Sequence, residues 1–294
     1  MKVIHLGLIG ASKGNGHPYS WSAIINGYDK KKMKHCEYKV IPNYLKKKHW
    51  PKDYIKNAKV THIWTQNFNL SKKIASTTFI PNVVTNLKLM IGKVDGVLLA
   101  RDDYVNHYKL ARPFLLAGIP IYIDKPISIT QKNLKKIYSK EIYQGQIFTC
   151  SATRYSKNLS LNNNTLRKLD KIKRIDAQTP KSWVKYGIHI IEPVLKMLPK
   201  NDRVSKFIIC SKKKKSILWK SKIITNFNIL KSINSKISII VTGEKGQVKL
   251  VFKDTFESFK NALKDFIYGI RKKTIKSNKK FNFKVVSIIE QGVI

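Results

Sequence analysis

The stretch Val3-Ile-His-Leu-Gly-Leu-Ile-Gly-Ala-Ser12 decides how the chain begins to fold. Val3 to Ile9 is a mostly apolar run, as expected of a strand that is buried on both faces of a sheet. Glycines follow, and Ser20 to Ile25 then reads as the start of a helix. A strand, a glycine turn and a helix in this order are typical of the opening of a βαβ unit.

The turn after this strand offers a site for a phosphate. A helix N-terminus presents backbone N–H groups and the positive end of the helix dipole, and glycine lets a ligand approach the backbone closely. Gly7, Gly10 and Ser12 match only part of the three-glycine dinucleotide fingerprint, and a simple tight turn would look the same. The position directly after the first strand favours a dinucleotide, with Gly7, Gly10, Ala11 and Ser12 as cofactor-binding residues.

The chain is strongly basic, with 58 Lys and Arg against 17 Asp and Glu in 294 residues, a formal charge of +41. Only seven of the basic residues are Arg. The excess is Lys, and abundant Ile and Asn accompany it, as A/T-rich codon usage would produce. Arg is the residue favoured for recognising phosphates and bases. We therefore expect no specific nucleic-acid partner, whereas an anionic substrate such as a sugar phosphate or sugar nucleotide remains compatible with the charge.

The cysteines and the apolar runs exclude other classes. Cys36, Cys150 and Cys210 are odd in number and widely spaced, which predicts neither a disulfide framework nor a structural metal site. Reduced thiols fit a cytoplasmic protein. No apolar stretch approaches the roughly 20 residues that cross a bilayer. His5 and Gly7 interrupt the N-terminal apolar run, which favours a strand over a signal peptide, so no membrane association is expected.

Strands and helices alternate over the first 126 residues. Expected strands and helices are, in order, a strand at 37–41, a strand at 60–65, a helix at 71–78, a strand at 96–100, a helix at 104–117 that Pro113 kinks or divides, and a strand at 119–123. This alternation predicts a parallel sheet of Rossmann type. We expect residues 1–126 to form a dinucleotide-binding domain.

The pattern changes after about residue 140. Strands are expected at 146–153, 207–210, 217–219, 237–241 and 248–252, and helices at 187–198 and 256–271. Gly243-Glu-Lys-Gly246 predicts a hairpin between the last two strands, and Lys212 to Lys215 reads as a solvated turn. We expect residues 127–294 to form an α+β domain with a mostly antiparallel sheet that binds substrate and mediates oligomerisation. The fold class is α/β, with two domains.

Asp124-Lys125-Pro126 follows the strand at 119–123. A lysine there lies at the carboxyl edge of a parallel sheet, where ligands bind, and Pro126 restricts Lys125 to an extended conformation. Ala100 ends the strand at 96–100, Arg101 and Asp102 follow it, and all three should face the same edge. His107, a little later, has capping or packing as its expected role.

Gly187-Ile-His-Ile-Ile-Glu-Pro193 supplies an imidazole. Histidine exchanges a proton near neutral pH, and oxidation of a secondary alcohol needs a base for the hydroxyl proton. Glu192 lies one turn after His189 on the same helix face, where it can orient the ring or bind a hydroxyl. For an isolated histidine, a role in packing would be equally expected.

The order and spacing of these three segments resemble the Gfo/Idh/MocA family, the nicotinamide-dependent sugar oxidoreductases related to glucose–fructose oxidoreductase and inositol dehydrogenase. The resemblance implies that Lys125 lies at the nicotinamide and the reacting carbon, with Asp124 replacing the usual Glu, and that His189 takes the hydroxyl proton. It implies NAD(P)-dependent hydride transfer with a sugar or sugar nucleotide, within surface-polysaccharide synthesis, by a homodimer or homotetramer.

Two departures from the family pattern leave alternatives open. Asn43 follows the strand expected at 37–41, where the family carries a ribose-binding acid, so Asn43 would bind the ribose or nearby lysines would admit a 2′-phosphate. The cofactor is NAD or NADP. Lys185 stands four residues before His189, where an acid is common. A catalytically silent sugar- or cofactor-binding relative is therefore the alternative. Expected substrate-binding residues are His17, Tyr19, Trp21, Arg154, Lys185 and Glu192.

Overall fold

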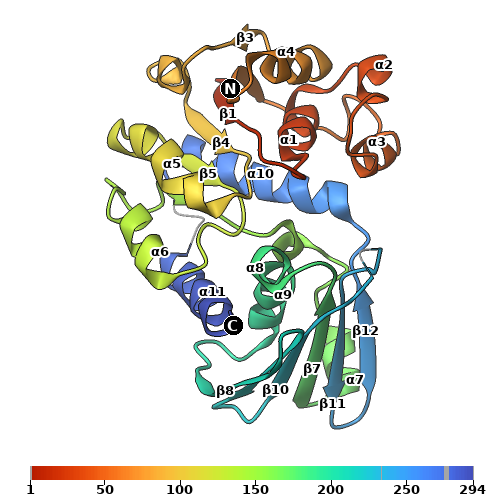
Figure 1. Ribbon diagram of the computed structural model, residues 1–294. Coiled ribbons are helices and arrows are strands. Elements are labelled where there is room, and N and C mark those ends of the chain that lie inside the picture. The colour runs from red at the N-terminus through yellow and green to blue at the C-terminus, as the bar shows by residue number, and fades with distance from the viewer. Residues whose placement is uncertain (1, 233, 275–277, 294) are drawn as a thin grey trace. The chain divides into compact units, whose positions relative to one another are not determined.

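A computed structural model describes residues 2–232, 234–274 and 278–293 (Figure 1). The chain divides into two compact units. The first comprises the described residues within 1–128, 132–150 and 259–282, and the second those within 129–131, 151–258 and 283–294. The sequence prediction places one boundary after residue 126. In the structure the first unit also includes two later segments, one of which lies near the end of the chain.

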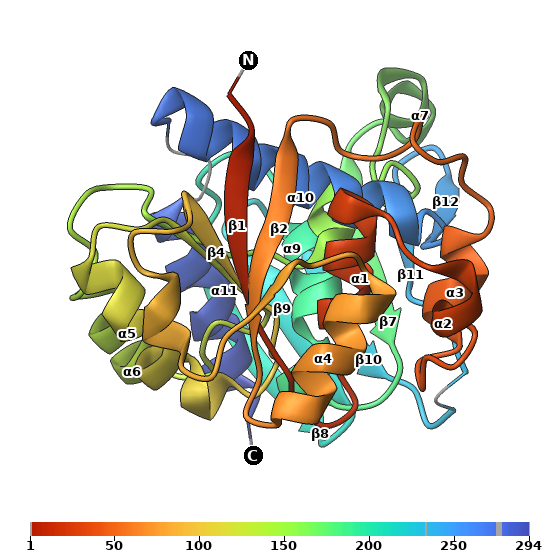
Figure 2. The same ribbon diagram turned by 90° about the horizontal axis from the view of Figure 1, so that it is seen from above.

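The first unit contains a six-stranded parallel sheet with the strand order β3-β2-β1-β4-β5-β6. β1 lies between β2 and β4 (Figure 2), and its Leu6 and Leu8 are fully buried. A sheet that is covered on both faces needs apolar side chains on both, which explains the continuous apolar run. The predicted Rossmann-type sheet is confirmed. Its strands are β1 (Ile4–Ile9), β2 (Ala58–Trp64), β3 (Asn82–Val83), β4 (Gly96–Leu99), β5 (Ile121–Ile123) and β6 (Ile147–Phe148).

Helices connect these strands, and their bounds are α1 (His17–Asn26), α2 (Lys30–Met33), α3 (Val40–Leu45), α4 (Phe68–Thr77), α5 (His107–Leu116) and α6 (Gln131–Tyr138), with single 3₁₀ turns η1 (Leu87–Met90) and η2 (Tyr104–Asn106). The predicted helix at 104–117 is divided before His107, and α5 itself continues through Pro113.

The strand predicted at 37–41 is wrong, because residues 40–45 form α3. Ile41 and Leu45 are both buried at a spacing of four, the period of a helix rather than of a strand. The place beside β1 is taken by β2 instead. The strand predicted at 146–153 was also expected to open the second domain. Within it only residues 147–148 form a strand, β6, which pairs with β5 in the first sheet.

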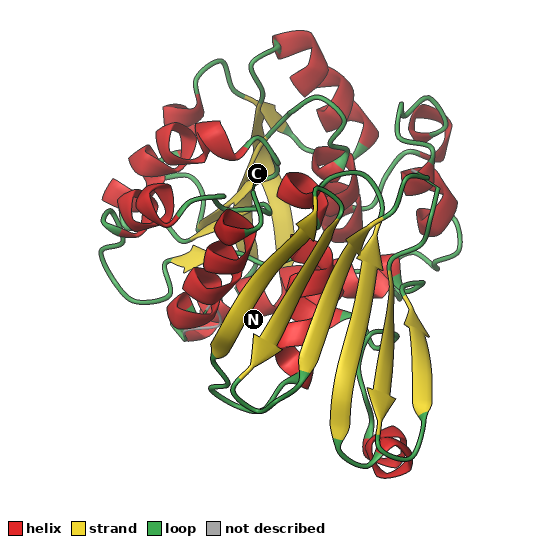
Figure 3. Ribbon diagram, turned by 60° about the horizontal axis from the view of Figure 1, so that its bottom comes forward, coloured by secondary structure: helices red, strands yellow, loops and turns green. Residues whose placement is uncertain are grey.

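The second unit is built on a six-stranded sheet with the order β12-β11-β7-β10-β9-β8 (Figure 3). Among the strands that the structure describes in this sheet, only β7 and β10 pair in parallel, so the predicted mostly antiparallel sheet is confirmed. The Gly243 N–H donates to Gly246 O at 2.9 Å and closes the predicted hairpin. The strands are β7 (Ile172–Thr179), β8 (Val204–Ser211), β9 (Lys214–Trp219), β10 (Ile224–Ile229), β11 (Ser238–Gly243) and β12 (Gln247–Val251).

The remaining helices are η3 (Ala152–Tyr155), α7 (Asn163–Leu169), α8 (Trp183–Tyr186), α9 (Ile188–Met197), α10 (Thr255–Lys272) and α11 (Lys279–Gln291). The predicted amphipathic helix at 256–271 is confirmed as α10. Its buried Phe266 packs in the first unit against Tyr122 of β5, with ring centroids 5.8 Å apart. A Cβ added at Gly96 of β4 would lie 2.5 Å from the Ile270 side chain, so glycine is needed for this close approach.

The solvated turn predicted at 212–215 is wrong for Lys215, whose side chain is fully buried. Its Nζ donates to the Lys212 and Ser211 carbonyl oxygens at 2.5 and 3.3 Å, and it lies over the Trp183 ring. Desolvation lowers the pKa of this amine. The long aliphatic stem allows a lysine to pack as an apolar residue while its own turn satisfies the charged end.

Candidate functional site

A pocket of about 310 Å³ opens beside the turn between β1 and α1. A Cβ on Gly10 would lie 2.7 Å from the Pro18 ring, so this position leaves no room for a side chain. Gly14 has a positive φ of 79° and open space where a Cβ would project. The turn therefore exposes backbone at the N-terminus of α1, as an anion site requires. The lining residues are Ala11, Ser12, Lys13, Gly14, Asn15, Pro18, Tyr19, Glu37, Tyr38, Gln66, Leu70 and Ile74.

Gln66, which sequence reasoning missed, follows β2 and lies against this turn. Its Nε2 donates to Ala11 O at 2.8 Å, and its Oε1 accepts the Ala11 N–H at 3.2 Å. The Arg101 Nη1 donates to the same Oε1 at 2.8 Å. The segment directly after the second strand of such a sheet, here β2, is the usual place of a ribose-binding acid. The strand predicted at 60–65 indicated that Gln66 follows a strand. The sheet order was needed to show that this strand lies beside β1.

The structure brings four of the predicted cofactor residues together at the carboxyl edge of the first sheet. The Ser12 hydroxyl donates to the Asp102 carboxylate at 2.7 Å and accepts the Asp102 N–H at 3.2 Å. Arg101 forms a two-pronged ion pair with Asp103 at 2.8 and 2.5 Å. The Asp103 pKa is lowered, because the hydrogen bonds and charge of Arg101 outweigh the effect of burial. The turn at Ala11 is thus held to the ends of both β2 and β4.

Two predicted cofactor residues lie elsewhere. Gly7 is inside β1, where a Cβ would meet the Met90 sulfur at 2.7 Å, so its role there is close packing. Asn43 is exposed on α3 and follows no strand, so the premise for its ribose role is wrong. Glu37 and Tyr38 come instead from the segment between α2 and α3 and line the pocket. Ala100 is fully buried at the end of β4.

Asp124, directly after β5, is buried and heavily hydrogen-bonded. Asn15 Nδ2 and His17 Nδ1 contact the same carboxylate oxygen at 2.8 and 2.6 Å, and the other oxygen accepts the Lys125 N–H at 2.7 Å. Burial alone would raise the pKa of Asp124. The charges of His17 and Lys125, with these hydrogen bonds, lower it well below its usual range. The carboxylate therefore ties the glycine turn to the segment that carries Lys125.

The aromatic residues after the turn pack together. His17 stacks on Trp21 with centroids 5.2 Å apart, and Trp21 stacks on Tyr122 at 4.5 Å. Trp21 is 1% exposed, so its ring surface is taken up by these neighbours, and its Nε1 has no partner among the residues described. Tyr19, expected with His17 and Trp21 to bind substrate, lines the pocket at the glycine turn. Burial raises its pKa above the usual range.

Lys125 is 5% exposed at the end of β5, at the same sheet edge as the glycine turn. His107 helps to fix the two loops at this edge, because its Nε2 lies 2.7 Å from Arg101 O and its Nδ1 3.0 Å from Ile127 O. His107 is fully buried, which agrees with the packing role expected for it.

In the second unit, His189 lies at the start of α9. Its Nδ1 is 2.6 Å from the Ser151 hydroxyl, and its ring meets the Tyr186 ring edge to face with centroids 5.0 Å apart. The Lys181 ammonium donates to the Tyr186 hydroxyl. Ser151 was not predicted as a site residue. It lies at the start of η3, in a segment that the sequence assigned to a strand.

Glu192, on α9, is buried and pairs with Arg154 of η3. Arg154 donates through Nε and Nη2 to the two carboxylate oxygens at 2.9 and 2.7 Å. Burial raises the pKa of Glu192, and the Arg154 charge offsets only part of that effect. The two predicted substrate-binding residues therefore bind each other. Lys185 lies on α8, whose N-terminus is capped by Ser182.

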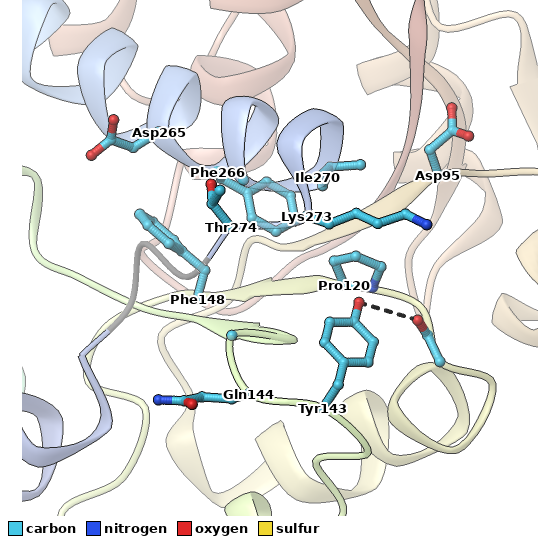
Figure 4. A pocket seen from close by; sticks show the side chains of 13 residues that line it. Asp95, Pro120, Tyr143, Gln144, Phe148, Asp265, Phe266, Ile270, Lys273 and Thr274 are labelled. Atoms are coloured by element: carbon cyan, nitrogen blue, oxygen red, sulfur yellow. Dashed lines mark hydrogen bonds between the residues drawn. The ribbon is translucent and has the colours of Figure 1, made fainter.

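Another cavity of the first unit, about 440 Å³ in volume, lies at the opposite edge of the sheet (Figure 4). Asp95 and Pro120 line it and precede β4 and β5, and Tyr143 donates to Gly118 O across it at 3.3 Å. Ligands of open parallel sheets bind at the carboxyl edge, which is the edge of the glycine turn.

Within residues 2–232, 234–274 and 278–293, no cluster of three or more His, Cys, Asp or Glu is arranged to hold a metal ion. Over the same ranges, no helix has the length and apolar character that a membrane crossing demands.

Comparisons with known proteins agree with this fold. Residues 39–151 match the model of an oxidoreductase family with an NAD-binding Rossmann fold, Gfo/Idh/MocA. No curated protein matches the chain significantly. The myo-inositol 2-dehydrogenase of Lactobacillus plantarum is 12% identical, with a TM-score of 0.72 over 98% of this chain and 96% of that one.

Two further solved structures extend the likeness. The scyllo-inositol dehydrogenase of Lactobacillus casei is 9% identical, with a TM-score of 0.71 over 99% of this chain and 96% of that one. A levoglucosan dehydrogenase in complex with NADH and L-sorbose is 13% identical, with a TM-score of 0.68 over 99% and 97%. At such identities the structures establish the fold alone. The family match, by contrast, rests on sequence and confirms the chain's resemblance to the Gfo/Idh/MocA oxidoreductases.

Proposed function

We propose that this chain is an NAD(P)-dependent oxidoreductase that transfers hydride between a nicotinamide and a sugar or sugar-nucleotide hydroxyl or ketone. The observation that carries the proposal is the pairing, at one sheet edge of the first unit, of a glycine-turn pocket with Lys125. The family match and the sugar dehydrogenases of the same fold support it. A cytoplasmic homodimer or homotetramer acting in surface-polysaccharide synthesis is part of the same proposal.

The residues of the glycine-turn pocket fit a dinucleotide. The backbone from Ala11 to Gly14 and the N-terminus of α1 would hold the pyrophosphate, with the Lys13 ammonium as an added charge. Tyr38 and Gln66 would bound the adenosine side. When bound, a nicotinamide supplies a hydride acceptor or donor.

The remaining chemistry falls to side chains of this chain. Lys125 would donate a hydrogen bond to the reacting sugar oxygen, and Asp124 would keep the Lys125 segment in place. His189 would take the hydroxyl proton at Nε2 during oxidation and return it during reduction. His17, Tyr19, Arg154, Lys185 and Glu192 remain the proposed neighbours of the substrate, whereas the burial of Trp21 favours a supporting role.

Titration of the full-length chain with NADH and NADPH, followed by nicotinamide fluorescence, tests the first half of this proposal. Binding at micromolar concentration is expected. A panel of free sugars and sugar nucleotides, followed by the nicotinamide absorbance, tests the second half. Absence of binding by either cofactor would show that the pocket is not a dinucleotide site.

A second candidate is a catalytically silent sugar- or cofactor-binding relative. Two observations favour it, namely Gln66 at the place of a ribose-binding carboxylate and Lys185 four residues before His189. It predicts cofactor or sugar binding without turnover of any sugar in the panel.

A further inference from the structure

Ser151 is held at two points by residues of α9. Its backbone N–H donates to Glu192 Oε2 at 2.9 Å, and its hydroxyl lies 2.6 Å from His189 Nδ1. His189 and Glu192 are three residues apart and so lie on the same helix face. Arg154 fixes both oxygens of Glu192, and Glu192 in turn accepts the Ser151 N–H. The backbone of Ser151 is therefore held in place beside the imidazole of His189.

The Ser151 hydroxyl has only one proton to donate. Its oxygen lies 2.7 Å from the Thr153 hydroxyl and accepts the Thr153 N–H at 3.3 Å, and both side chains are almost completely buried. If the proton goes to Thr153, the Ser151 oxygen accepts from His189 Nδ1–H. If it goes to His189, Nδ1 must carry no proton. The state of the imidazole is therefore coupled to the direction of this one O–H bond.

We propose that Ser151 is a positioning residue for His189: with its proton donated to Thr153, its oxygen accepts Nδ1–H and leaves the Nε2 lone pair as the base. This inference deepens the proposed function and rests on it for its kinetic consequence. A carboxylate commonly fixes a catalytic histidine in this way. Here a hydroxyl pair does so, and Lys185 occupies the position where the family resemblance implies an acid.

The arrangement predicts how the tautomer of His189 changes in variants of Thr153 and Ser151. Thr153→Val removes the acceptor of the Ser151 proton while keeping side-chain volume and the backbone N–H. The Ser151 hydroxyl is then expected to donate to Nδ1 instead, which moves the imidazole proton to Nε2. Ser151→Ala removes the hydroxyl itself, so the preference for Nδ1–H is expected to disappear. Ser151→Thr keeps a hydroxyl and is expected to show the wild-type preference for Nδ1–H.

Long-range ¹H–¹⁵N spectra of the full-length chain, labelled at histidine, read the tautomer without cofactor or substrate. The chain has seven histidines, and the signal absent from His189→Asn identifies the ring. Spectra near pH 8.5, about two units above the ordinary histidine pKa, report the neutral ring. The expected result is Nδ1–H in the wild type and a shift toward Nε2–H in Thr153→Val. Nε2–H in the wild type, or an unchanged tautomer in both variants, overturns the proposal.

Kinetics provide the second measurement. Ser151→Ala is expected to lower kcat about 10- to 100-fold with the sugar KM nearly unchanged, by analogy with the loss of a hydrogen-bond partner that orients a metal-binding histidine. Asn162→Ala is the matched control, because it removes a helix N-cap of the same unit, where Asn162 accepts the Thr165 N–H at 2.8 Å. That variant should leave both kcat and the tautomer unchanged. Wild-type kcat in Ser151→Ala overturns the proposal.

The two measurements separate this inference from the proposed function. If no sugar is turned over but Thr153→Val moves the proton as expected, the positioning inference holds and the oxidoreductase proposal fails. If turnover is found but the tautomer is unaffected by either variant, the oxidoreductase proposal holds and Ser151 is not the positioning residue.

Discussion

The side chain of Gln66 exchanges two hydrogen bonds with the backbone of Ala11, one in each direction. The segment that follows β2 is thereby fixed, through Gln66, against the turn that follows β1. In a dinucleotide-binding sheet this is where a carboxylate accepts hydrogen bonds from the adenosine ribose hydroxyls. An amide here, beside the Arg101 guanidinium, lacks the negative charge that would repel a 2′-phosphate.

We therefore predict that the wild-type chain binds NAD and NADP with affinities that differ by less than about 100-fold, or about 2.7 kcal/mol. Gln66→Glu should raise the preference for NAD by about tenfold or more, roughly 1.4 kcal/mol, because the new charge repels the 2′-phosphate. The ratio of the two dissociation constants, measured by fluorescence, checks this. Asn67→Asp adds the same charge one residue later, at a helix cap outside the pocket lining, and should leave the ratio unchanged.

Lys125 and His189 are expected to act in the chemical step rather than in cofactor binding. Lys125→Met keeps the stem without the charge, and His189→Asn keeps a polar group that cannot act as a base. Each should lower kcat by roughly 10²–10⁴-fold, the usual effect of a positioned acid–base group. The double variant should be little worse than the worse single one, since residues that act as a unit are not additive.

Steady-state rates on a sugar found in the panel measure these effects, and NADH titration verifies that cofactor affinity is close to wild type. If both single variants turn over at the wild-type rate, the catalytic assignment is wrong. The silent-relative alternative then gains support.

Asp124 should make the stability of the first unit depend on pH. Its folded pKa lies below the unfolded value of about 3.9, so its stabilising effect is complete above that value. The effect is lost as the pH falls towards the folded pKa. Asp124→Asn leaves His17 beside a neutral amide and should cost about 3–5 kcal/mol at pH 7, as for one partner removed from a buried pair.

Urea midpoints of wild type and Asp124→Asn at several pH values test this. The difference between the two midpoints should narrow as the pH falls below about 4. A difference that widens below about pH 4 would contradict the assignment of the depressed pKa to Asp124.

Arg154 and Glu192 are expected to stabilise the second unit mainly as a pair. Arg154→Leu should cost about 3–5 kcal/mol, because a buried carboxylate loses its partner, and the Arg154→Leu/Glu192→Leu double variant should recover part of that loss. Since burial raises the pKa of Glu192, the penalty in Arg154→Leu falls as the pH drops towards the unfolded value of about 4.3. Thermal or urea unfolding at pH 7 and near pH 4.5 measures both effects. Additive single and double variants would show that the pair is not coupled.

Features that depend on neighbours along the chain could be predicted from the sequence. The apolar run from Val3 to Ile9 predicted a buried strand, and the glycines after it predicted a turn that admits close backbone approach. The spacing of apolar residues predicted α10, and Gly243 to Gly246 predicted a hairpin. Each of these follows from a local period or a local backbone preference.

The pattern of apolar and charged residues gave a wrong prediction at two places. The apolar residues at 37–41 suit a short strand as well as a helix, and only the spacing of buried Ile41 and Leu45 distinguishes the two. Lys215 lies in a run of charged residues whose composition predicts solvent, yet its stem is buried because the turn satisfies its amine.

Which side chains meet is seen only in the tertiary structure. Gln66 reaches the glycine turn across 55 positions, and Ser151 reaches His189 across 38. Neither pairing follows from a local pattern, because each depends on which strand lies beside β1 or on where η3 packs against α9. The sequence thus predicted the segments to which we assign the proposed chemistry. Their hydrogen-bond partners are set by long-range packing, whose free energy is spread over many contacts and leaves no signature in any one stretch of the chain.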